Sequence, residues 1–177
     1  MTNLNDTIQE GLDKYGTTSG GWFKFEDGDN KMRVLTMPAV MGQHFSPGGY
    51  KGICIGAEDN CEGCKEETKA TPRWLTWILD YKDNELKLIK FPYKIIKSLG
   101  EYQNNEEYAF ETFPMPYDIN ITAENAGTTD VVYTIIPARN ESEVSKEALE
   151  ALEKEGKPED IVEKMKEKVR GGDKKKD

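Results

Sequence analysis

The feature that most constrains this chain is a group of metal-binding side chains in one short segment. His44, Cys54, Cys61 and Cys64 follow the spacing His-x9-Cys-x6-Cys-x2-Cys, and they include every cysteine and the only histidine of the 177 residues. Cysteines gathered in this way do not form a disulfide framework, in which paired cysteines are spread along the chain. Three thiolates and one imidazole are instead a ligand set of tetrahedral Zn²⁺. The segment therefore predicts one bound zinc ion.

The predicted zinc ion is structural. Four protein ligands close the coordination sphere and leave no position for an activated water molecule. The two-residue gap between Cys61 and Cys64 lets both thiolates converge on one ion, with backbone N–H groups directed at the sulfurs and Gly63 supplying backbone freedom. We expect the ion to order the loop of residues 42–65. The alternative is three reduced thiols and an unrelated surface histidine.

Most of the remaining chain has the character of a β domain. Residues 22–138 are rich in β-branched and aromatic residues, with Gly, Pro and Asn-Asp turn signals between them. The pattern predicts a mainly β fold with strands over residues 31–37, 74–81, 85–91, 117–122 and 131–136. Residues 82–84 and 125–127 are expected to form hairpin turns.

Two segments with a different composition flank this domain. Residues 1–21 combine a short helical pattern with a small, polar linker, and we expect an N-terminal arm there. Residues 139–177 are rich in Glu, Lys, Ala and Leu and predict a charged helical tail with a frayed end. Its first helix is expected to have Ser145 as N-cap and its second to start at Pro158. The apolar positions at helical spacing are Leu4, Ile8, Leu12, Leu149, Leu152, Ile161, Met165 and Val169.

The charge of the chain is unevenly distributed. A net charge of -9 and a pI near 4.8 exclude a uniformly basic surface. Residues 31–98 nevertheless hold 11 basic and 8 acidic groups, whereas residues 99–136 hold 7 acidic groups and no basic one. No apolar run has the length of a membrane span, and the start of the chain lacks the basic and apolar regions of a signal peptide. We expect a soluble, cytoplasmic protein.

Residues 73–81 and 85–91 place aromatic and basic side chains on two adjacent predicted strands. Single-stranded nucleic acid suits this combination, because its bases stack on aromatic rings and its phosphates bind Lys and Arg. The two-residue period of a strand places Trp74 and Trp77 on opposite faces, so one is expected in the core. The alternative places both in the core and the lysines in solvent. The candidate contacts are Lys31, Arg33, Tyr50, Arg73, Trp74, Trp77, Tyr81, Lys87, Lys90 and Phe91.

Several stretches together carry a resemblance to a known family. They are residues 22–24, 30–35, the segment with His44, Cys54, Cys61 and Cys64, and residues 74–91, 117–121 and 133–137. They resemble the zinc-containing, OB-fold single-stranded DNA-binding proteins of tailed bacteriophages. The resemblance implies a five-stranded OB-fold barrel over residues 22–138 with an inserted zinc loop. It also implies a protein that coats and protects single-stranded DNA during phage replication, recombination and repair in the host cytoplasm.

The resemblance has one departure and one rival. Many members of that family end in an acidic tail, whereas this chain ends in RGGDKKKD. The rival interpretation is a zinc-bearing adaptor that binds a polymerase or another replication or transcription factor. We expect the apolar face of the tail to contact a phage or host protein or a second copy, although it could also pack on the barrel or stay partly disordered.

Catalysis is not expected from this sequence. It has no glycine-rich phosphate loop, and no nucleophile has a histidine partner once His44 is a metal ligand. RNA and DNA are not distinguished by the residues themselves, because stacking and phosphate neutralisation do not sense the 2′-hydroxyl.

Overall fold

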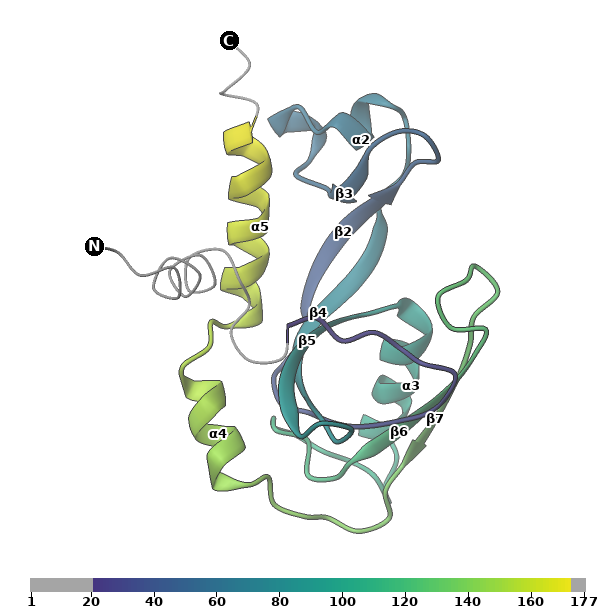
Figure 1. Cartoon of the computed structure of the whole chain (residues 1–177), viewed down its shortest axis with the longest axis vertical. Coiled ribbons are helices and arrows are strands. Elements are labelled where there is room, and N and C mark those ends of the chain that lie inside the picture. Colours follow the sequence, from purple (N-terminus) through teal and green to yellow (C-terminus); the bar gives the residue numbers. More distant parts are fainter. Residues whose placement is uncertain (1–20, 173–177) are drawn as a thin grey trace, which may run out of the picture.

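One antiparallel sheet and five helical segments make up residues 21–172, which are the residues that the computed structural model describes (Figure 1). The expected N-terminal arm and the frayed end after Gly172 lie outside these residues. The strands are β1 (Gly28–Val34), β2 (Ala39–Phe45), β3 (Lys51–Ile53), β4 (Thr71–Asp80), β5 (Glu85–Phe91), β6 (Ile119–Glu124) and β7 (Val132–Pro137). The helices are η1 (Ala57–Asp59), α2 (Glu62–Lys65), α3 (Tyr93–Gln103), α4 (Lys146–Glu153) and α5 (Pro158–Gly172). The mainly β fold is confirmed.

Strands β1 and β2 act as one long strand along the same edge of β4. Both are antiparallel to β4, with Val34 opposite Ile78 and Ala39 opposite Leu75, while β5 runs along the other edge. The connection between them bulges, and there the Thr36 hydroxyl oxygen accepts a hydrogen bond of 3.1 Å from the Trp77 backbone N–H. A bulge suits this position because Pro38 has no N–H to donate.

The closed five-stranded barrel of the sequence prediction is not confirmed. Strand β6 pairs with β1 and β7 pairs with β6, and among the described residues β7 has no second strand partner. The outer edge of β5 instead bonds the segment before β1, where the Phe23 N–H donates to the Leu88 carbonyl at 2.8 Å. The strands therefore form an open antiparallel sheet.

Each face of the sheet is covered by its own helices. Ile78, Ile89 and Phe91 pack with Ile95 and Leu99 of α3 on one face. The other face carries a second core, which α4 and α5 cover. Members of that core are Leu75, Trp77, Leu79, Leu86, Leu88, Ala148 and Val162.

The C-terminal helices belong to the folded body of the chain. Helix α5 contacts β2, β3 and β4, and α4 contacts β5. Leu152, Ile161 and Met165 are partly buried against the second core, as in the alternative in which the tail packs on the domain. Leu149 remains 37% exposed. Among residues 21–172, no helix has the length and apolar character needed to cross a bilayer.

The structure confirms some of the predicted strands and helix ends and adds elements that were not predicted. Strand β5 has the predicted bounds, and the four other predicted strands appear with ends shifted by one to three residues. Ser145 caps α4 by accepting a hydrogen bond from the Ala148 N–H at 3.3 Å, and α5 begins at Pro158 as expected. Strands β2 and β3 and helix α3 were not predicted.

Candidate metal centre and nucleic-acid surface

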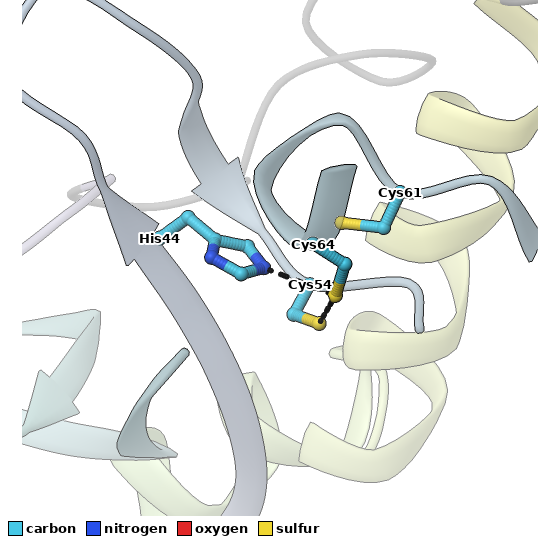
Figure 2. A group of neighbouring side chains, drawn as sticks. All are labelled: His44, Cys54, Cys61 and Cys64. Carbon is cyan, nitrogen blue, oxygen red and sulfur yellow. Dashed lines mark hydrogen bonds between the residues drawn. The ribbon is translucent and has the colours of Figure 1, made fainter. Parts of the chain in front are cut away.

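The four predicted zinc ligands come from three neighbouring elements. His44 lies on β2, Cys54 directly follows β3, and Cys61 and Cys64 stand at the start and inside of α2. Pairing of β2 with β3, which sets His44 opposite Gly52, brings the first two ligands together. The ligand atoms of all four residues lie within 4.8 Å of one another, and Figure 2 shows them converging on one space.

The distances between these ligand atoms suit a zinc ion. The sulfurs of Cys54 and Cys64 are 3.6 Å apart, and His44 Nε2 is 3.7 Å from the Cys64 sulfur. In a tetrahedron with Zn–S bonds of about 2.3 Å, the ligand atoms are about 3.8 Å apart. The cluster can therefore hold a metal ion, and its donor set and spacing are consistent with zinc. His44 would bind through Nε2.

Gly63 is required beside His44 for space rather than for backbone freedom. The His44 ring is fully buried, and a Cβ atom added at Gly63 would lie 2.2 Å from His44 Cγ. The His44 ring cannot shift away from such a Cβ at low cost, because the ring is fully buried. The sequence prediction identified the right glycine, but Gly63 is not among the glycines with positive φ, so the assigned reason was wrong.

The surroundings of the cluster favour the charged form of Cys61 and disfavour that of Cys64. Burial alone would raise the pKa of the Cys61 thiol, but backbone hydrogen bonds from Cys64, Ile55 and Gly63 lower it to about 7. Hydrogen bonding to Cys54 and burial raise the pKa of the Cys64 thiol to about 11. One thiolate is thus favoured and a second is disfavoured. A divalent cation reverses this, because it attracts every thiolate at once.

Tyr50 supports the metal cluster and is not an open contact for bases. Its ring meets the His44 ring edge-on at 5.9 Å, and its hydroxyl donates to the Ile53 carbonyl at 2.8 Å. Its backbone N–H donates to the Glu66 carboxylate at 3.0 Å. The Nδ1 atom of His44 is buried and has no hydrogen-bond partner among the described residues.

Three of the predicted nucleic-acid contacts are buried. Trp77 is 1% exposed and its indole N–H donates to the Gly156 carbonyl at 2.8 Å, and Phe91 is completely buried. Arg33 is 1% exposed and binds the Asp118 carboxylate at 2.7 Å, with further bonds to Met115 and Ser142. In this structure these side chains are inaccessible to a strand, so the prediction that they contact bases or phosphates is corrected.

Three more of the predicted contacts interact within the chain. Lys87 binds the carboxylates of Asp80 at 2.7 Å and Asp83 at 2.5 Å. The Tyr81 hydroxyl donates to Asp118 at 2.7 Å, and burial together with this carboxylate raises the pKa of Tyr81 to about 12. Lys31 lies 5.5 Å from the centre of the Tyr81 ring.

Trp74 is half-buried, and its side chain lies on the other face of the sheet from that of Arg73. Its ring is 6.3 Å from that of Tyr93 at the start of α3. It packs against the first core together with α3. Of the two predicted tryptophans, the fully buried one is therefore Trp77.

Arg73 and Lys90 lie together on one face of the sheet. The Arg73 guanidinium is 5.1 Å from the Phe45 ring centre, and Lys90 Nζ is 4.8 Å from that of Trp22. Lys90 also donates a hydrogen bond to the side-chain oxygen of Gln43 at 3.4 Å. We call these five residues the cation–aromatic row; it crosses β2, β4, β5 and the segment before β1. Trp22 and Phe45 are 42% and 48% exposed.

The two cations of this row are not neutralised. Burial lowers the pKa of Arg73, and burial together with the charge of Arg73 lowers the pKa of Lys90. Among residues 21–172, neither side chain has a carboxylate within ion-pair distance. Two half-buried cations that repel each other cost stability, and a bound anion would offset that cost.

Trp22 was missing from the predicted contact residues, and Phe45 was only a weak candidate among the residues of the zinc loop. Each had a local signal: Trp22 follows the glycine pair at residues 20–21, and Phe45 directly follows a predicted zinc ligand. No family model, no curated protein and no solved structure matches this chain. Its function is therefore argued from its own residues.

Proposed function

We propose that this protein binds single-stranded DNA without sequence specificity, and that it coats and protects exposed strands in phage replication, recombination and repair. The observation that supports this proposal most is the pair of unneutralised cations, Arg73 and Lys90, each stacked with an exposed aromatic ring. Phosphates would bind the cations and bases would stack on Trp22 and Phe45. Such a surface reads no sequence, because every base has an aromatic face.

The chemistry of the row favours single strands over duplex. In a duplex the base faces are stacked on one another, so the rings of Trp22 and Phe45 would have no partner. Each base stacked on an aromatic side chain contributes about 1–3 kcal/mol. Phosphate binding releases counterions, so affinity should fall steeply as salt rises.

The strand order also supports the proposal. With β1 and β2 counted as one bent strand, the order along the sheet is β5, β4, β1/β2, β6 and β7, and α3 lies between β5 and β6 in the chain. An OB fold is a partly open five-stranded barrel that binds oligonucleotides on the face of its second and third strands and on adjoining loops. On the proposed OB-fold assignment, strands β4 and β5 would take those positions. They carry Arg73 and Lys90, and the metal cluster lies in the adjoining insertion.

The proposed zinc ion has a structural role. Held by His44, Cys54, Cys61 and Cys64, it would cross-link β2, β3 and α2, which have few buried apolar side chains of their own. Phe45 follows His44 on β2 and points to the other face of the strand. Fixing His44 thus also fixes Phe45 beneath Arg73.

A protein-binding adaptor is the second candidate. It is favoured by Met37, Val40 and Tyr93, which are 65%, 64% and 58% exposed. Met37 borders an apolar pocket of about 230 Å³ between β4 and α3, and Trp74 lines the same pocket. We propose no catalytic role for either candidate. Phage or host replication proteins remain proposed partners.

The two candidates are separated by one titration. Zinc-replete protein is added to fluorescently labelled oligo-dT, to a duplex of equal length and to oligo-U, each at low and at moderate salt. The proposal expects salt-sensitive binding to the single strands and much weaker binding to the duplex, and oligo-U measures the preference for DNA over RNA. An absence of binding to oligo-dT at low salt contradicts the proposal and leaves the adaptor.

A further inference from the structure

A hollow of about 230 Å³ opens at the end of the cation–aromatic row. It lies between the segment before β1, the end of β5 and the start of β7. Its walls include Trp22, Phe25, Arg73, Lys90, Pro92 and Tyr133. Sites for drug-sized ligands have volumes of about 300–1,000 Å³, so this hollow suits one small ring system.

The inner wall of the hollow is aromatic. The Phe25 ring packs against Tyr133 at 4.8 Å with a tilt of 51°, and Phe23 meets Phe25 edge-on at 5.1 Å. Packing among these rings holds each in place. A flat, polarisable ligand is favoured by such a wall, because aromatic pairs gain energy beyond the area that they bury.

The polar groups at the hollow are nearly all hydrogen-bond donors or cations. Arg73 and Lys90 carry positive charge, and Trp22 offers an indole N–H with no hydrogen-bond partner among residues 21–172. The Tyr133 hydroxyl likewise has no hydrogen-bond partner among those residues. Burial raises the pKa of Tyr133, so its hydroxyl keeps its proton and can donate. No carboxylate lines the hollow. A matching ligand is therefore flat, anionic and rich in acceptors.

We infer that the hollow receives a single nucleobase of the bound strand, with its phosphate between Arg73 and Lys90. This inference rests on the proposed function and deepens it. The base would lie against Tyr133 and Phe25, and its carbonyl or ring-nitrogen acceptors would meet the donors of Tyr133 and Trp22. Free inorganic phosphate would use the two cations but leave the aromatic wall without a role. One base of the strand is thus enclosed, while its neighbours stack on open rings.

The first test compares the affinity of three variants for labelled oligo-dT. Tyr133→Leu removes the ring and the hydroxyl, and we expect about a fivefold to 150-fold loss, the range for one stacked base. Tyr133→Phe keeps the ring and should lose less. Tyr108→Leu is the matched control, because Tyr108 also packs partly buried against the first core but lies between acidic residues, away from the hollow. Zinc content and thermal unfolding show whether each variant is folded.

Photo-crosslinking of the wild-type chain gives a second test that does not depend on a variant. Oligo-dT containing 5-iododeoxyuridine is irradiated with the protein, and the linked residues are mapped by mass spectrometry. We expect links to Tyr133 or Phe25 as well as to Trp22. Competition by thymidine monophosphate shows whether a free nucleotide also enters the hollow, which would extend the inference beyond strands.

The outcomes separate this inference from the proposed function. If the wild type binds oligo-dT but Tyr133→Leu binds within twofold of it, and crosslinks appear only at Trp22 and Phe45, the hollow takes no base and strand binding stands. If Tyr133→Leu does not fold, an unchanged affinity of Tyr133→Phe together with absent Tyr133 and Phe25 crosslinks overturns the inference. No binding by the wild type overturns both.

Discussion

Two pairs of cations on neighbouring strands have opposite surroundings. Arg33 and Lys87 are held by carboxylates, Arg33 by Asp118 and Lys87 by Asp80 and Asp83. Arg73 and Lys90 have aromatic rings beside them and no acidic partner among the described residues. In a folded protein, charge that is already neutralised serves the fold, and charge left without a partner is available for a ligand. A count of basic residues therefore does not show which of them can bind a ligand. Their partners in the folded chain decide that.

The largest expected effect concerns the metal cluster that supports one member of the second pair. Gly63→Ala should abolish stoichiometric zinc binding, because the new Cβ would lie 2.2 Å from the His44 ring. Gly100→Ala is the control, since a Cβ there meets no atom within 4 Å. Zinc is measured by elemental analysis and strand affinity by titration. We expect Gly63→Ala to lose affinity as well, because Phe45 loses its support beside Arg73. A Gly63→Ala protein that retains one zinc ion would show that the site accommodates the added Cβ, which would contradict this prediction.

Arg33→Met should produce the next largest effect, and it should act on stability. The change removes hydrogen bonds to Met115 and Ser142 and leaves the Asp118 carboxylate with the Tyr81 hydroxyl but without its cationic partner. Breaking a buried ion pair costs about 3–5 kcal/mol, so urea unfolding should shift to a much lower midpoint. Lys82→Met, which breaks an exposed pair with Glu26, should cost less than about 1 kcal/mol. An Arg33→Met protein as stable as wild type would remove the distinction between the two pairs.

Replacing the second pair should act on binding instead. Arg73→Met and Lys90→Met are each expected to weaken oligo-dT binding and to reduce the slope of log affinity against log salt by about 0.7, the value for one phosphate on a single strand. Unfolding free energy should stay level or rise, since a half-buried unpaired charge is removed. Lys87→Met is the matched control on β5: it should lose stability and keep affinity. Equal losses of affinity for Lys87→Met and Lys90→Met would contradict the comparison.

The smallest effect should be a pH dependence of strand affinity that is caused by deprotonation of Lys90. Burial and the neighbouring charge of Arg73 lower its pKa below the ordinary lysine value. Lys90 is charged below its pKa, so its contribution to strand binding is lost as the pH rises through that pKa. Stability changes in the opposite direction, because the unfolded chain holds that proton more tightly.

The check is to measure affinity and urea unfolding from neutral to alkaline pH at constant ionic strength. Lys90→Arg should bind with a flatter pH profile, because a guanidinium keeps its proton. If the two proteins show the same decline in affinity, another group controls the alkaline loss.

Features determined by nearby residues could be predicted from the sequence. The metal cluster was one, because its four ligands lie within one short segment and converge once β2 pairs with β3. Helix α4 was another, since its cap and its apolar positions are local. Helix α3 could have been found as well: Ile95 and Leu99 are four residues apart and both are buried.

Features that depend on distant partners could not be predicted. The carboxylate that binds Arg33 is 85 residues away in the sequence, so nothing near Arg33 indicates that it is neutralised. Strand β2 was hidden because Pro38 and Gly42 make its surroundings look like a loop, and its pairing with β4 is what makes it a strand. The burial of Trp77 likewise depends on a turn near Gly156, to which its indole N–H is bonded.

The pairing of Gln43 with Thr71 has a consequence for how the chain folds. Strands β2 and β4 form a hairpin whose connection is the whole of residues 44–70, and closing a long flexible connection slows the meeting of its ends. All four candidate metal ligands lie within that connection. An ion bound early would shorten the flexible chain that must close before β4 finds β2. The supply of zinc during synthesis would then influence the rate of folding as well as the stability of the finished protein.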